Sequence, residues 1–132
     1  MIVVPACPTA WPWTLSAWAG SPGSISDEAR AAYHAAWADD ANIAGSCDDY
    51  RAGATIDAEL DAEDREAGHK ITCPVLALWG DPKGRRDLTE VWSRWADDVR
   101  GAGLPCGHFI PEEAPDALLE HLVPFLARPL ER

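Results

Sequence analysis

Apolar residues follow a helical spacing over much of the chain between residues 27 and 67. The stretch 40–52 places them three and four residues apart, and it is flanked by an Ala-rich stretch over 27–37 and a strongly acidic one over 55–67. Asp27 belongs to the residue types that cap a helix N-terminus, and Gly53 and Gly68 come where glycine commonly ends a helix. The pattern therefore predicts three consecutive helices.

The residues before this region show no sustained period and are dense in Pro, Gly, Ser and Trp. Proline lacks the backbone N–H that a helix interior needs, so the four prolines exclude a long helix here. They are Pro5, Pro8, Pro12 and Pro22. We therefore expect an irregular segment over 1–26.

The spacing changes after residue 70. A continuous apolar run of strand length covers 74–80 and is bounded by Pro and Gly, as in a parallel strand buried on both faces. A polar loop, an amphipathic helix, a short strand and a closing helix are predicted to follow, at 81–86, 88–99, 100–106 and 114–127. Pro124 lies inside the last pattern and is expected to kink or shorten that helix.

This order of elements is typical of the closing part of a doubly wound parallel sheet, so the predicted fold class is α/β. Two strands do not make such a sheet, and further strands are expected to precede them. The chain has 132 residues with an apolar fraction of 47%, as in ordinary globular proteins. Its seven Trp residues need large neighbouring groups, which indicates a wide core or a lined cavity.

The formal net charge of −11 limits the classes of partner. A field of this sign repels phosphate backbones and anionic lipid, so neither nucleic acid nor a membrane is expected as a partner. An anionic substrate would need local positive groups to offset the field. No apolar run approaches the roughly 18 residues that cross a bilayer, and the first residues lack the basic leader of a signal peptide.

The cysteines are widely spaced and form no Cys-x-x-Cys pair, which argues against a zinc knuckle or a redox motif. They are Cys7, Cys47, Cys73 and Cys106. Free thiols in a reducing, cytoplasmic compartment are the expectation, with no metal and no cofactor.

His108 is the sharpest candidate for chemistry. It follows a predicted strand and precedes a helix, and loops at the carboxyl ends of parallel strands are where open α/β sheets build their sites. An imidazole can accept a proton from water near neutral pH, and the adjacent Gly107 allows close approach of backbone. Taken alone, such a histidine is more often a surface or packed loop residue.

The sequence around His108 resembles that of a known family. The stretch 106–115 is similar to the segment around the catalytic histidine of α/β-hydrolases, most closely that of haloacetate, including fluoroacetate, dehalogenases. Two further stretches agree in order and spacing. The stretch 47–54 resembles the end of the family's helical cap, and 66–80 resembles the run into its penultimate strand. The likeness covers residues from about 27 to 126.

The resemblance implies the C-terminal half of an α/β-hydrolase. Residues 27–54 would be the end of the helical cap, and 55–132 the last two strands and helices of the parallel core. Such enzymes remove halide from a short haloacid: an aspartate displaces it, and a histidine-activated water hydrolyses the ester formed. His108 matches that histidine, and Tyr50 matches a cap tyrosine whose hydroxyl holds the departing halide. Without the resemblance, Tyr50 would be interpreted as a packed helix-face aromatic.

Other parts of the family's site have no match. No aspartate stands on a glycine-flanked strand-to-helix turn, and the substrate arginines and a halide-binding His-Trp pair belong upstream. The stretch 19–23 imitates a serine elbow, but it follows no strand and contains Pro22, so it is interpreted as a decoy. Whether the chain is an enzyme is therefore left open, and alone it is expected to be inactive.

Several acidic and histidine residues receive structural interpretations. Asp81 comes one residue after Gly80, whereas the family's alternative triad acid comes three after, where Lys83 stands, so Asp81 is interpreted as a turn or cap residue. The acidic run within 57–66 is interpreted as a solvated helix face. Surface positions are expected for the remaining histidines, which are His34, His69 and His121.

Three readings remain open for function. The first is a haloacetate dehalogenase-like hydrolase acting on a small haloacid, and the second is an α/β-hydrolase of other specificity, such as an esterase or an epoxide hydrolase. The third is a non-catalytic remnant or binding module that associates with a partner through the unpaired edges of its strands. Substrate preference, halide preference and oligomeric state, a homodimer included, are not decided by the sequence.

Overall fold

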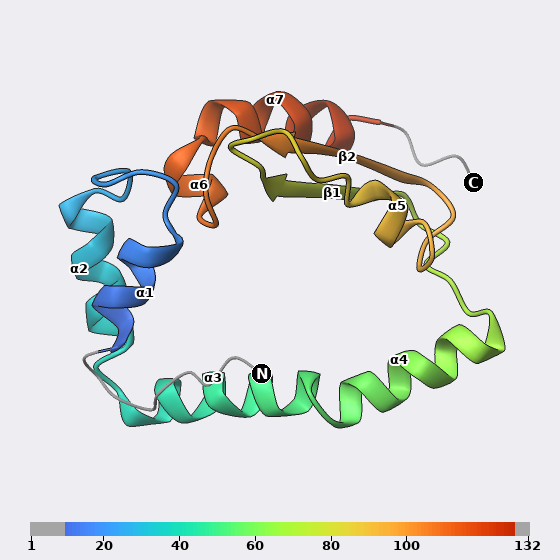
Figure 1. The fold of residues 1–132 in the computed structure, drawn as a ribbon, viewed down its shortest axis with the longest axis horizontal. Helices are drawn as coiled ribbons and strands as arrows, with labels where there is room; N and C mark the ends of the chain where they lie inside the picture. Colours follow the sequence, from blue (N-terminus) through green and yellow to red (C-terminus); the bar gives the residue numbers. More distant parts are fainter. Residues whose placement is uncertain (1–9, 129–132) are drawn as a thin grey trace. The chain divides into compact units, whose positions relative to one another are not determined.

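A computed structural model describes residues 10–128 of the chain, and the side chains from residue 14 onward (Figure 1). These residues form two compact units. Within the described range, the first comprises 10–17 and 25–69, and the second comprises 18–24 and 70–128. Each unit is described by itself. Cys7, Pro5 and Pro8 lie outside the described residues.

Helices make up the first unit. They are α1 (Ala10–Trp18), whose last residue belongs to the second unit, α2 (Asp27–Ala36), α3 (Asp40–Gly53) and α4 (Ile56–Ala67). The three helices predicted between residues 27 and 67 are thus confirmed. Gly68 ends α4 in the left-handed conformation, with φ of 71°, as a C-terminal glycine is expected to do.

Two details of this unit differ from the prediction. Ser26, and not Asp27, caps α2, because the Ser26 Oγ accepts a hydrogen bond from the Ala29 N–H at 3.1 Å. The segment predicted to be irregular contains α1. Pro12 falls in the first turn of α1, where a missing N–H leaves no helical hydrogen bond unmade.

The second unit contains a parallel pair of strands, β1 (Val75–Gly80) and β2 (Val99–Leu104). Their register pairs Val75 with Val99 and Gly80 with Leu104, so both carboxyl ends lie at one edge. The short helices α5 (Thr89–Trp92) and α6 (Ile110–Glu113) and the longer α7 (Pro115–Leu126) complete it. Figure 1 shows α7 running along the sheet, where it contacts β1. This is part of an α/β fold, as predicted.

The helix predicted over 88–99 is wrong beyond its first turn. The helix α5 ends at Trp92, and the chain then turns back to pair with residues before β1. Ile71 forms a parallel bridge with Ala96, its N–H donating to the Trp95 carbonyl at 2.8 Å, and Ala96 is buried. Pairing with Ile71 therefore overrides the helical spacing of this stretch.

The buried core of the second unit is small, and its outer apolar surface is extensive. Ala77, Ala96, Leu104 and Cys106 are buried, whereas Leu119, Val123 and Leu126 of α7 are exposed. Pro124 lies within α7, which ends two residues later. Among residues 10–128, no helix has both the length and the apolar character needed to cross a membrane.

Candidate functional site

The loops that follow β1 and β2 meet at the carboxyl edge of the strand pair. Asp81 directly follows β1, and its N–H donates to the Leu104 carbonyl, the last residue of β2, at 2.7 Å. His108 lies four residues beyond that carbonyl, between β2 and α6. The sequence expectation that His108 stands on a loop after a parallel strand is confirmed.

The backbone and the ring of His108 contact residues 18–24 of the same unit. The His108 N–H donates to the Trp18 carbonyl at 2.9 Å. Its ring lies edge-on to the Trp18 ring at 5.0 Å and edge-on to the Phe109 ring at 5.2 Å. Within residues 10–128 neither ring nitrogen has a hydrogen-bond partner, so both remain open to water or a reacting group. The side chain is exposed.

A single carboxylate, that of Glu113, binds the backbone on both sides of His108. Its Oε2 accepts from the Gly107 N–H at 3.1 Å and from the Gly20 N–H at 2.6 Å, and its Oε1 accepts from the Phe109 N–H at 3.0 Å. Burial raises the pKa of Glu113, but these three donors and the nearby His108 lower it more, so it lies below its ordinary value. Glu113 is therefore an ionised anchor of the His108 loop.

Three glycines let backbone segments approach closely at this site. A Cβ on Gly107 would lie 2.1 Å from the Gly20 nitrogen, and one on Gly80 would lie 1.8 Å from the Gly107 carbonyl oxygen. No side chain fits at either distance. The stretch 19–23, interpreted above as a decoy for a serine elbow, thus packs its Gly20 against the loop that carries His108.

Asp81 organises the loop after β1. Its Oδ2 accepts from the Arg86 N–H at 2.8 Å. The backbone N–H groups of Arg86 and Arg85, and less strongly that of Lys83, lower the pKa of Asp81 more than burial raises it. The buried Trp79 indole N–H faces the same carboxylate without reaching hydrogen-bonding geometry. The interpretation of Asp81 as a turn residue is confirmed, and no hydrogen bond joins it to His108 among the described atoms.

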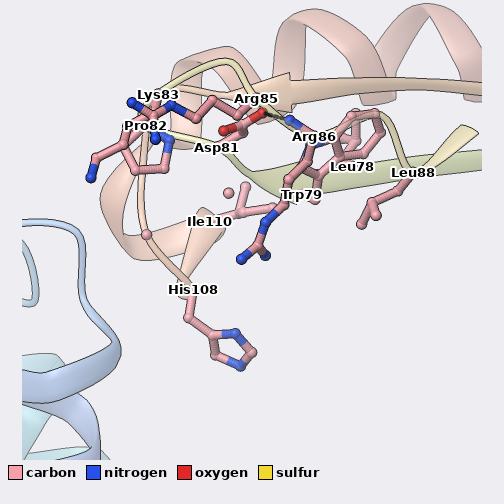
Figure 2. Close-up of a pocket in the computed structure, with 12 residues that line it drawn as sticks. Leu78, Trp79, Asp81, Pro82, Lys83, Arg85, Arg86, Leu88, His108 and Ile110 are labelled. Atoms are coloured by element: carbon pink, nitrogen blue, oxygen red, sulfur yellow. Dashed lines mark hydrogen bonds between the residues drawn. The ribbon is translucent and has the colours of Figure 1, made fainter.

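His108 lines a pocket of about 700 Å³ together with residues of the Asp81 loop (Figure 2). Three cations line the same pocket, and they are Lys83, Arg85 and Arg86. Within the described part of the chain their side chains form no ion pair or hydrogen bond. Figure 2 shows the Arg86 side chain extending from the loop toward Ile110 and His108. The pocket therefore combines an open imidazole with positive charge in a chain whose net charge is −11.

Acid is expected to loosen this site. The pKa values of Asp81 and Glu113 lie below their ordinary values of 3.8 and 4.5, so the folded state binds fewer protons than the unfolded chain. Their contribution to stability is complete above those ordinary values and is lost as pH falls through the lower folded ones. Urea midpoints between pH 7 and 3 should fall at the acid end.

Glu113→Gln should flatten this acid dependence, and Glu120→Gln, which changes an exposed carboxylate of α7, should leave it unchanged. Equal slopes in the two variants would contradict the assignment of the effect to Glu113.

Tyr50, the other site residue predicted, lies on α3 in the first unit and is 47% exposed. Its predicted role remains a prediction. His34 lies in the last turn of α2, and the exposed His69 pairs with Asp64 at the end of α4, at 3.0 Å between Nδ1 and Oδ1. His121 is exposed on α7. The acidic residues of α4 are exposed, as the interpretation of a solvated face predicts.

Free thiols are found at the three cysteines that the structure describes, Cys47, Cys73 and Cys106. Cys106 is buried beside the site, and burial together with the Glu113 charge raises the pKa of its thiol. Among residues 10–128, no group of three or more His, Cys, Asp and Glu side chains is arranged to hold a metal ion.

Sequence reasoning missed Glu113, Gly20 and the cations around the pocket. Glu113 stands five residues after His108. An acidic residue at this distance after a loop could have been predicted to accept hydrogen bonds from the backbone N–H groups of that loop. Gly20 offered no such signal, because its partner lies 93 residues away in the chain.

Comparison with known proteins finds similarity to hydrolases. No protein-family model matches the chain. The chain is 42% identical over 98 residues to a fluoroacetate dehalogenase from Burkholderia sp., covering 72% of this chain and 32% of that protein. It is 33% identical over 108 residues to a soluble epoxide hydrolase from Corynebacterium sp. (strain C12), covering 81% of this chain and 36% of that protein. It thus spans about a third of the length of these curated relatives.

Solved structures give the same fold. A protein from Nostoc sp. PCC 7120 described as an α/β hydrolase matches with a TM-score of 0.83 and 38% identity, over 92% of this chain and 42% of that chain. One from Pseudomonas aeruginosa described as an epoxide hydrolase matches with a TM-score of 0.81 and 38% identity, over 91% and 41%.

Proposed function

We propose that this chain, which belongs to the haloacetate dehalogenase-like α/β-hydrolases and carries part of their fold, supplies the water-activating histidine of a hydrolase acting on short haloacids. His108 is that residue. The observation that carries the proposal is the pocket in which the imidazole of His108 lies with three cations that have no ion-pair partner among residues 10–128.

The proposed reaction has two steps. In the first, an aspartate carboxylate supplied by the rest of the hydrolase attacks the carbon that bears the halogen, the carbon–halogen bond breaks, and halide leaves. In the second, His108 takes a proton from water, and the resulting hydroxide attacks the ester carbonyl. The ester bond breaks, the hydroxy acid is released, and the carboxylate is restored. The second step requires one ring nitrogen that can accept a proton, and among residues 10–128 neither ring nitrogen of His108 is engaged by a hydrogen-bond partner.

The Tyr50 hydroxyl is proposed to donate a hydrogen bond to the leaving halide. A phenolic O–H stabilises charge that develops as the carbon–halogen bond breaks, so its effect is larger in the transition state than in the bound substrate. Tyr50 is accessible on α3, which is proposed to be the end of the helical cap.

The free thiols of the described cysteines support a reducing, cytoplasmic location.

The charge of the pocket favours a haloacid over a neutral substrate. An excess of 11 negative charges repels a carboxylate at a distance, so binding needs local positive charge to overcome it. Lys83, Arg85 and Arg86 provide this charge beside His108. Asp81 is the one acid among the described residues that line the pocket. Its carboxylate accepts a hydrogen bond from the loop backbone and forms no ion pair with these three cations.

A second candidate is epoxide hydrolysis, favoured by the similarity to the Corynebacterium enzyme. Opening an epoxide with an aspartate gives the same kind of ester, and His108 would hydrolyse it in the same way. An epoxide carries no charge, however, and gains nothing from three cations in the pocket wall. Sensitivity of substrate affinity to those cations therefore separates the two candidates.

The experiment that tests the proposal uses a chimera. Residues 18–126 of this chain, which include the Trp18 and Gly20 contacts of the His108 loop, would replace the matching part of the Burkholderia fluoroacetate dehalogenase, and fluoride release from fluoroacetate would be measured with an ion-selective electrode. We expect release above that of the truncated dehalogenase alone. A soluble, folded chimera that releases no fluoride from fluoroacetate and no chloride from chloroacetate would contradict the proposal.

Removing the Arg86 charge should weaken substrate binding. In the chimera, Arg86→Gln is expected to raise KM for fluoroacetate about tenfold, because a hydrogen bond to a charged group contributes about 1.5–3 kcal/mol. The kcat should change less, since Arg86 is proposed to bind the substrate carboxylate and not the reacting carbon. Arg94→Gln is the matched control, because Arg94 is exposed and lies outside the pocket. An equal KM for both variants would exclude Arg86 from substrate recognition.

A further inference from the structure

The contacts of Glu113 are concentrated on the peptide groups that flank His108. One carboxylate accepts from the N–H of the residue before the histidine and from the N–H of the residue after it, at 3.1 and 3.0 Å. Its third donor, the Gly20 N–H at 2.6 Å, comes from a segment 93 residues earlier. A carboxylate that accepts several backbone N–H groups makes charge-assisted hydrogen bonds, which are shorter and stronger than neutral ones.

These bonds constrain where the imidazole lies. The Phe109 N–H fixes the peptide plane that follows the His108 Cα, and the Gly107 N–H fixes the next plane but one before it, so Glu113 restrains the backbone at both ends of the Gly107–His108 step. The His108 N–H is itself held by the Trp18 carbonyl at 2.9 Å. The ring then has edge contacts with Trp18 and Phe109, at 5.0 and 5.2 Å. Glu113 holds two of the three backbone groups that set the ring's position, and it also binds the Gly20 N–H of the segment packed against the His108 loop.

We infer that Glu113 is a positioning residue for His108: its carboxylate clamps the Gly20, Gly107 and Phe109 amides together and thereby fixes the orientation of the imidazole that activates water. The assignment of water activation to His108 rests on the proposed function, whereas the clamp itself rests on the hydrogen bonds. The negative carboxylate also attracts the positive charge that the ring gains when it takes a proton from water.

The chemistry of the clamp requires a carboxylate. Three N–H donors converge on two oxygens, and an ionised carboxylate is acceptor-only on both. Glutamine would offer one oxygen and one NH₂ group, so at least one backbone N–H would face another donor. Aspartate keeps both oxygens but is one methylene shorter, and it cannot span the same three amides. Glu113→Gln therefore replaces one acceptor oxygen with a donor group while the side-chain shape stays almost the same. Glu113→Asp keeps both acceptor oxygens and tests whether the length of the glutamate side chain is needed.

The experiment is an NMR titration of the whole 132-residue chain. The amide signals of Gly20, Gly107 and Phe109 should move together with a common midpoint as the pH is lowered, at a pH below the ordinary Glu value of 4.5. The titratable groups that face Glu113 are His108 and the Cys106 thiol, and burial together with the Glu113 charge raises the pKa of that thiol, away from this acid range. The wild-type titration needs no variant, so it decides the clamp even if a substitution prevents folding.

The variants then test the effect on His108. Glu113→Gln should abolish the shared titration and reduce the nuclear Overhauser contacts of the His108 ring with the Trp18 and Phe109 rings. Glu120→Gln, the exposed control on α7, should change neither. In the chimera, Glu113→Gln should lower ester hydrolysis at least tenfold while leaving kcat/KM for fluoroacetate within twofold, because kcat/KM reports only the steps up to halide loss, and Glu113→Asp should recover part of the loss. A purely structural role would lower the amount of folded protein and leave kcat per folded molecule unchanged.

Two results would overturn the inference. One is three amides that titrate with unrelated midpoints, and the other is His108 ring contacts that survive Glu113→Gln in a folded chain. Failure of the proposed function has a different signature: His108 variants would retain full turnover while the shared titration of the three amides persists.

Discussion

His108→Asn is expected to lower halide release in the chimera by about 10²–10⁴-fold, the range that a positioned general base contributes. The first step, displacement of halide by the aspartate, does not need the imidazole, so it should proceed once per active site. Hydrolysis of the ester then stops, because nothing takes the proton from water. The covalent ester should accumulate and appear in intact-protein mass spectra as a stable adduct.

The control for this variant is His121→Asn, which removes an exposed histidine of α7 and should leave turnover and mass unchanged. A burst of one halide per site followed by arrest identifies loss of the second step, whereas loss of the burst itself would assign His108 to another role. Formation of one covalent ester per site is expected with a haloacid and with an epoxide, although only the haloacid releases halide, so the mass adduct tests the histidine independently of substrate class.

Local patterns predicted much of the second unit. The continuous apolar run of β1 is bounded by Pro74 and Gly80, and its apolar residues do not follow the spacing of the helices. The strand could therefore be predicted from neighbouring residues alone. The position of His108 followed from the same reasoning, since a loop after a parallel strand is a common place for a reactive group. These are features in which nearby residues decide the conformation.

Long-range pairing decided the rest. The stretch 88–99 has helical spacing, but Ile71 takes Ala96 into a parallel bridge, and a helix cannot offer its backbone to another strand. The anchoring of the His108 loop depends on Gly20, whose only sequence signal was a misleading likeness to a serine elbow. The cations around the pocket could be seen in the sequence, but their place beside His108 depends on the meeting of two loops.

Gly80→Ala should have the largest effect on the stability of the second unit. Gly80 ends β1, and a Cβ there would lie 1.8 Å from the carbonyl oxygen of Gly107 and 2.6 Å from its carbonyl carbon. Both are backbone atoms, so no side-chain rotation relieves the clash. Either the end of β1 moves away from the His108 loop, or that loop loses its contacts with Gly20 and Glu113. We expect a loss of about 3 kcal/mol in the free energy of unfolding, at the upper end for overpacking.

Urea unfolding followed by circular dichroism measures this loss, and the matched control is Gly45→Ala. Gly45 lies within α3, where an added Cβ meets no atom within 4 Å, so alanine there should stabilise its helix by about 0.5–1 kcal/mol. Opposite signs for one substitution at two sites would show that Gly80 is needed for close approach and not for flexibility. Unchanged Gly107 and His108 amide signals in Gly80→Ala would contradict the predicted clash between residue 80 and the Gly107 backbone. If the signals shift together, the end of β1 is the surface against which the His108 loop is set, and the imidazole depends on a strand residue 28 positions away in the chain.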